Sequence, residues 1–129
     1  MDQSVDEPSS ALSTAESERV RLARLALTAA LRVPGVLGSD TGPGKLFVTV
    51  GDGERLQGIV CAAAKPGGYG VGLRLVCGMV PLPQLAEQVR AAVRLAAARA
   101  AIDIVSVDVT VADVVTATGV ANLAHTAGG

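Results

Sequence analysis

Residues 69–111, YGVGLRLVCGMVPLPQLAEQVRAAVRLAAARAAIDIVSVDVTV, decide the fold of this chain. Apolar residues alternate with small or polar ones along 69–77 and again along 105–111, where Val105 begins the alternation. A period of two predicts strands with one buried face and one wetter face. Between them, apolar residues recur at the spacing of a helical stripe: Leu82, Leu85, Ala86, Val89, Val93, Ala96 and Ala100. We therefore expect two strands of one sheet, parallel or separated, with the intervening helix covering a face.

An earlier helix is predicted over residues 13–33. Ser13 and Glu16 have the spacing of a capping box, and the proline at position 34 ends the helix because it pushes the preceding residue out of the helical region. Between this helix and residue 69, turn-rich loops separate strands predicted over 46–50 and 56–64, and Gly58 indicates a bulge or a close neighbour. The short turns predict antiparallel pairing.

The order helix, three or four strands, helix, strand predicts an α+β fold. We expect a two-layer sandwich in which two helices pack on one face of a mixed sheet of four to five strands. The polar, acidic start predicts a disordered tail over residues 1–12, followed by a single domain over 13–114 and a flexible tail over 115–129.

Composition excludes several classes of function. Phe47 and Tyr69 are the only aromatic residues, so the chain lacks the aromatic platforms on which single-stranded nucleic acids stack. Residues 1–18 contain five acids and no base, whereas residues 19–129 hold seven acids against all eleven bases. No apolar run is long enough to cross a membrane, and no signal pattern precedes the domain. We therefore expect a cytoplasmic protein without direct membrane insertion.

No pattern of catalytic, cofactor-binding or metal-binding residues emerges. Cys61 and Cys77 fall on predicted strands and are expected to be buried free thiols. His125, the one histidine, lies near the end of the chain, so no placed base is available to activate a nucleophile. The glycine run at 67–72 precedes a strand, whereas a dinucleotide-binding loop follows one. We expect no enzymatic activity, no cofactor and no metal.

The helices do carry a candidate interaction surface. Arginine outnumbers lysine nine to two, and the planar arginine fork suits bidentate contacts with carboxylates or lipid phosphates. On the later helix, helical spacing places charged residues beside the apolar stripe and one leucine away from it. On the earlier helix, it places several arginines along one edge of the apolar face. A contact surface for a partner or a second copy is one interpretation, and a solvated helix face is the other. The candidate residues are Glu87, Arg90, Arg94, Leu95, Arg21, Arg24 and Arg32.

Four segments in this order resemble a known family. They are ALRVPGV at 30–36, LFVTV at 46–50, VPLPQLAEQVRAAV at 80–93 and IVSVDVTVADV at 104–114. Over residues 20–114 the chain is similar to the alkaline shock protein family of envelope-stress proteins from Gram-positive bacteria, in its actinobacterial form. That family often has Tyr-Gly before the second helix and a glycine before the last strand. This chain has Cys-Gly and Ala-Ala at those places.

The resemblance implies a non-enzymatic protein at the cytoplasmic face of the membrane. Such a protein self-associates, is held there by a small membrane-anchored partner, and serves cell-envelope homeostasis; no catalytic residue is carried over. The alternative is a small nucleic-acid-binding module of KH-like type, which clamps the backbone with a Gly-x-x-Gly loop between helices. Residues 35–38 have that spacing but contain no basic residue.

Overall fold

Strand β5 (Tyr69–Gly78) is the centre of the sheet. The computed structural model describes the backbone of residues 3–115 and the side chains of residues 17–115. Parallel strand β6 (Ile104–Val115) pairs with one edge of β5 along its whole length. Two antiparallel strands share the other edge, with β4 (Ile59–Ala63) on the first part of β5 and β1 (Val36–Ser39) on the last. β1 and β4 therefore lie end to end along β5.

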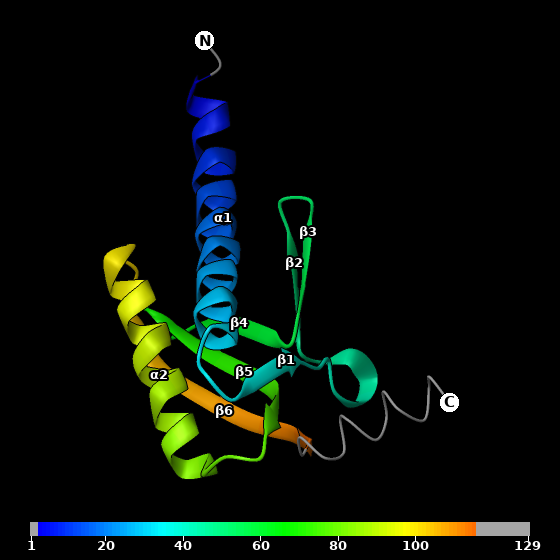
Figure 1. Ribbon diagram of the computed structural model, residues 1–129. Helices are drawn as coiled ribbons and strands as arrows, with labels where there is room; N and C mark the ends of the chain where they lie inside the picture. The colour runs from blue at the N-terminus through cyan, green and yellow to red at the C-terminus, as the bar shows by residue number, and fades with distance from the viewer. Residues whose placement is uncertain (1–2, 116–129) are drawn as a thin grey trace.

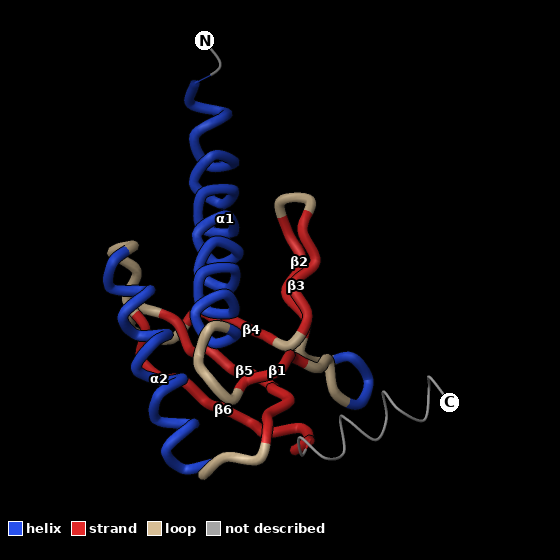
Figure 2. The backbone as a smooth tube through the Cα atoms, viewed as in Figure 1, coloured by secondary structure: helices blue, strands red, loops and turns tan. Residues whose placement is uncertain are grey.

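Two helices cover one face of this mixed sheet, as Figures 1 and 2 show. Helix α1 (Gln3–Leu31) packs on β4 and β1, and helix α2 (Leu82–Arg99) connects β5 to β6 and packs on β6. This arrangement confirms the predicted two-layer α+β fold and the predicted strand–helix–strand unit, whose strands are parallel.

A small hairpin stands beside α1, apart from the main sheet. Strands β2 (Val48–Gly51) and β3 (Glu54–Gln57) pair antiparallel with each other, as the short turn predicted. A short 3-10 helix, η1 (Pro43–Lys45), lies in the loop that joins β1 to this hairpin. Thr49 is buried, and its hydroxyl donates a 2.8 Å hydrogen bond to the Ile59 carbonyl at the start of β4. That bond ties the hairpin to the main sheet.

The core lies between the sheet and the two helices. Alternate residues of β5, namely Val71, Leu73, Leu75 and Cys77, are all buried on the helix-facing side, which confirms the predicted alternation. Aliphatic side chains of modest size fill the helical side of the core, because the chain has almost no aromatic residues. The buried helix residues are Val20, Leu22, Ala23, Ala26 and Ala30 on α1 and Leu85, Val89, Val93 and Ala97 on α2.

The alternation predicted for the last strand fails at Val105, which is 55% exposed. A bulge is the reason: Tyr69 pairs with Ile104, but the next residue, Gly70, pairs with Ser106. The extra residue in β6 shifts the side-chain alternation by one. Ile104 therefore packs against the core in place of Val105.

Two predicted boundaries were also wrong. The strand predicted over 56–64 is divided at Gly58 into β3 and β4. Helix α1 begins at Gln3 rather than at Ser13, because extending an established helix costs less than nucleating one and needs no cap at that position. The predicted tail of residues 1–12 thus overlaps α1. Most of the predicted tail of 115–129 lies outside the described residues.

Gly58 occupies the junction at which β1 meets β4. Its φ of +94° is one that glycine adopts without strain, and a Cβ there would collide with the Ser39 side chain. Arg74 of β5 joins the two strands, because its N–H donates to the Gly58 carbonyl and its carbonyl accepts from the N–H of Asp40. The Arg74 side chain also pairs with the Asp40 carboxylate at 3.0 Å. The end-to-end placement of β1 and β4 thus requires a residue without a side chain at position 58.

We predict that Gly58→Ala destabilises the fold by about 2–4 kcal/mol, because backbone strain and overpacking act together. Chemical denaturation followed by circular dichroism measures the change. Gly67→Ala is the matched control, since Gly67 has an ordinary φ and nothing within 4 Å of an added Cβ. Equal stability of the two variants would contradict the close approach at Gly58.

Candidate functional site

A groove lies on the described surface between α1 and α2. It has a volume of about 560 Å³ and is lined only by residues of the two helices. The helices pack through small buried residues such as Ala23, Ala26 and Ala97, so their axes can approach closely while larger side chains flank the seam. The floor is apolar and consists mainly of alanines with Leu25 and Leu95.

Arginines surround this apolar floor. Arg21, Arg24 and Arg32 extend from α1 and Arg99 extends from α2, and none of the lining residues in the described part of the chain is acidic. Among residues 17–115, no ion pair forms to Arg21, Arg32 or Arg99. Like charges in one groove repel one another and attract an anionic group, so the site favours an occupant that carries carboxylates or phosphates.

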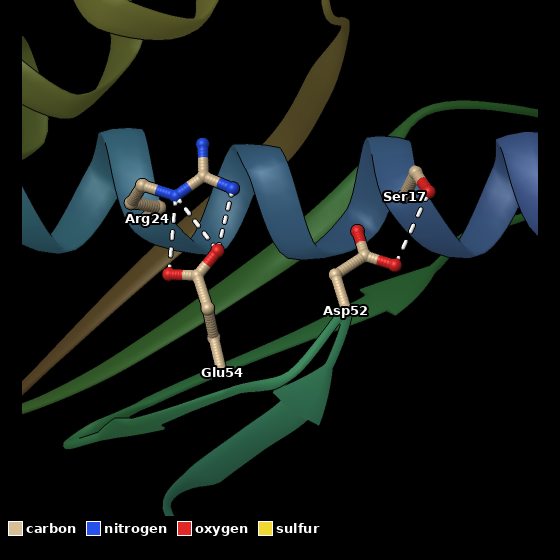
Figure 3. Close-up of polar contacts among 4 residues, drawn as sticks. All are labelled: Ser17, Arg24, Asp52 and Glu54. Atoms are coloured by element: carbon tan, nitrogen blue, oxygen red, sulfur yellow. Dashed lines mark hydrogen bonds and ion pairs between the residues drawn. The ribbon is translucent and has the colours of Figure 1, made fainter.

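Arg24 has a second contact, with the hairpin (Figure 3). Its guanidinium binds the Glu54 carboxylate of β3 with a shortest distance of 2.7 Å, and Arg24 Nε donates to both carboxylate oxygens. This hydrogen bonding lowers the pKa of Glu54 below its ordinary value and raises that of Arg24. On the same side of α1, the Ser17 hydroxyl donates to Asp52 at 3.3 Å. The hairpin is thus held against α1 by polar contacts that neutralise one of the groove arginines.

The structure divides the predicted interaction residues into two places. Four of them, Arg21, Arg24, Arg32 and Leu95, line the groove, where they come together with Arg99. We missed Arg99 from the sequence, although it follows Leu95 by four positions and so lies on the same side of α2.

Glu87 and Arg90 lie instead where α2 meets β6. Arg90 pairs with Glu87 at 2.8 Å, and its Nε donates to the Val107 carbonyl at 3.3 Å. β6 pairs only with β5 among the described strands, so this contact satisfies a carbonyl on its outer edge. Arg94 is exposed and belongs to neither group.

Both thiols are buried, as predicted, and neither forms a disulfide. Burial raises the pKa of Cys61 to about 11 and also raises that of Cys77. A thiol with such a pKa is a poor nucleophile at neutral pH, because the thiolate is the reactive form. These residues therefore act as small apolar side chains of the core.

The described part of the chain also bears on metal binding, on membrane crossing and on the Gly-x-x-Gly spacing. No group of three or more His, Cys, Asp or Glu residues there could hold a metal ion. None of the described helices is both long and apolar enough to cross a membrane. Gly35 lies between α1 and β1 and Gly38 lies within β1, so the pair does not form a loop between two helices, and Gly35 faces Val80 and Leu85. His125 lies outside the described residues.

Comparison with protein-family models, with curated proteins and with solved structures finds no match to this chain.

The contact between Glu54 and Arg24 predicts a specific pH dependence. The pKa of Glu54 is lower in the folded state than in the unfolded chain. The ionised Glu54 carboxylate therefore stabilises the fold at pH values above its ordinary pKa of 4.5, and this stabilisation is lost as the pH falls through the lowered pKa. We expect Glu54→Gln to lower the melting temperature at pH 7, and the difference from the wild type to vanish in acid.

Thermal unfolding monitored by circular dichroism across this pH range tests the prediction. Asp108→Asn is the control, since Asp108 is exposed and forms no ion pair among the described residues. A Glu54→Gln difference that stays constant between neutral and acid pH would count against the ion pair.

Thiol labelling checks the burial of the cysteines. With a pKa of about 11, Cys61 is thiolate in roughly one molecule per thousand at pH 8, so iodoacetamide should label the folded protein far more slowly than the unfolded chain. Cys61→Ser and Cys77→Ser each leave a single thiol to follow by mass spectrometry. Equally fast labelling with and without denaturant would show that a thiol is accessible.

Proposed function

We propose that this protein is a non-enzymatic scaffold of the alkaline shock protein type. In this proposal it self-associates at the cytoplasmic face of the membrane, is held there by a small membrane-anchored partner, and serves the envelope-stress response. The resemblance over residues 20–114 and the α+β fold support the proposal.

The groove between α1 and α2 is the observation that carries the proposal. An apolar floor bordered by charged side chains has the character of a docking site for a helix or an extended peptide. Leu95 is 51% exposed on this surface, which is consistent with a residue that is covered only on binding. The site thus supplies contacts to another protein.

Anchoring through a partner fits this chain better than direct membrane binding. Helices that lie in a membrane interface combine Trp, Phe or Leu on an apolar face that is free to contact lipid with Lys or Arg on the polar face. The chain has no Trp, and Phe47, Lys45 and Lys65 all lie outside α1 and α2. Both helices have arginines and leucines, but their apolar stripes are buried in the core and are not free to contact lipid.

Multi-angle light scattering and cell fractionation test this proposal. We expect the mass of the purified full chain to exceed that of a monomer and to rise with concentration. In cells, we expect the protein in the membrane fraction only while its anchoring partner is present, and no flotation with protein-free liposomes. A chain that stays monomeric and never sediments with membranes would contradict the proposal. A salt-dependent shift with single-stranded RNA would instead favour the KH-like alternative.

A further inference from the structure

The groove arginines have a charge complement within the same sequence. Residues 1–18 contain five acidic residues and no basic residue, and most of this segment forms the first part of α1. The same segment contains Val5 and Leu12 at a spacing of seven, which is the repeat of helices that pack against other helices. It therefore has the composition expected of an occupant for an apolar groove with a cationic rim.

The first two turns of this segment, which include Asp6 and Glu7, cannot reach the groove of their own chain. α1 is one continuous helix from Gln3 to Leu31, and the groove residues of α1 begin at Arg21. A rise of 1.5 Å per residue places Gln3 roughly 27 Å along the helix axis from Arg21. Figure 1 shows this part of α1 projecting beyond the sheet. The segment is thus held away from its own groove and presented to another molecule.

We infer that the acidic N-terminal part of α1 from one copy docks in the arginine-lined groove of a second copy. This inference rests on the proposed self-association and names the two surfaces that form it. Acidic side chains of the incoming helix meet Arg21, Arg32 and Arg99, and its apolar residues cover Leu25 and Leu95. Arg24 contributes less, because Glu54 already neutralises it.

The two surfaces lie at different places on the molecule, so the contact is heterologous. A copy whose helix is docked in a second copy still has an empty groove. A copy whose groove is occupied still has a helix that is free to dock elsewhere. Such contacts build open chains or rings rather than a closed two-fold dimer. The mass should therefore increase continuously with concentration and decrease with salt, which screens the charges.

A charge exchange between two variants tests the inference. The groove variant carries Arg21→Glu and Arg99→Glu, and the helix variant carries Asp6→Lys and Glu7→Lys. Each variant alone replaces two attractive charges of the contact by repulsive ones, so we expect self-association to weaken at least about tenfold. Mixed in equal amounts, each variant offers a surface that complements the other, and light scattering should show the larger species again. Species larger than a heterodimer form only if the Lys helix docks in the Glu groove, so their recovery separates the charge effect from any loss of helix in the Lys variant.

Two controls accompany the exchange. Arg55→Glu with Lys65→Glu reverses the same number of charges at exposed positions outside the groove and should associate as the wild type does. Circular dichroism confirms that every variant is folded.

The outcomes separate this inference from the proposed function. If the wild type associates and both variants associate equally well, the docking is wrong while the scaffold proposal stands. If the wild type is monomeric under all conditions, the proposed function itself fails. If the groove variant loses binding to vesicles of anionic phospholipid and mixing restores no association, the groove serves a lipid surface and the inference is overturned.

Discussion

Pairing on both edges of β5 is the constraint on which the rest of the structure depends. Parallel pairing of β5 with β6 requires a crossover connection between the two strands. Helix α2 is that connection, and it packs on the same face of the sheet as α1. β4 and β1 share the opposite edge, and α1 packs across them. The buried side of β5 then supplies Val71, Leu73, Leu75 and Cys77 to a core that both helices close.

The groove follows from the way in which the helices meet. A core of Ala, Val and Leu leaves no large side chain to separate α1 from α2, so the helices pack closely. The longer side chains are displaced to the outer side of this seam, where arginines from both helices surround Leu25 and Leu95. Positive charge beside an apolar strip attracts an occupant that is anionic and partly apolar.

The hairpin links this outer surface to the sheet. β2 and β3 form no ladder with β5, yet Thr49 ties them to β4, and Glu54 and Asp52 contact the outer side of α1. The hairpin therefore approaches α1 closely: a Cβ at Gly51 would meet the Val20 side chain at 2.7 Å. Because Glu54 of the hairpin pairs with Arg24, the hairpin also reduces the number of groove arginines that are left without a carboxylate partner.

The sequence by itself determined the class of fold, because periods of two and of 3.6 residues report directly which face of each strand and helix is buried. It also identified three of the four arginines that line the groove, together with Leu95, since Arg21, Arg24, Arg32 and Leu95 lie off the buried stripes of their helices. Only the tertiary structure decided which of these residues meet. It separated Glu87 and Arg90 from the groove, brought Arg99 into it, and exposed Val105 through a bulge. Local periodicity carries no information on contacts between elements that are distant in the sequence, and those contacts depend on strand register and on how the two helices pack.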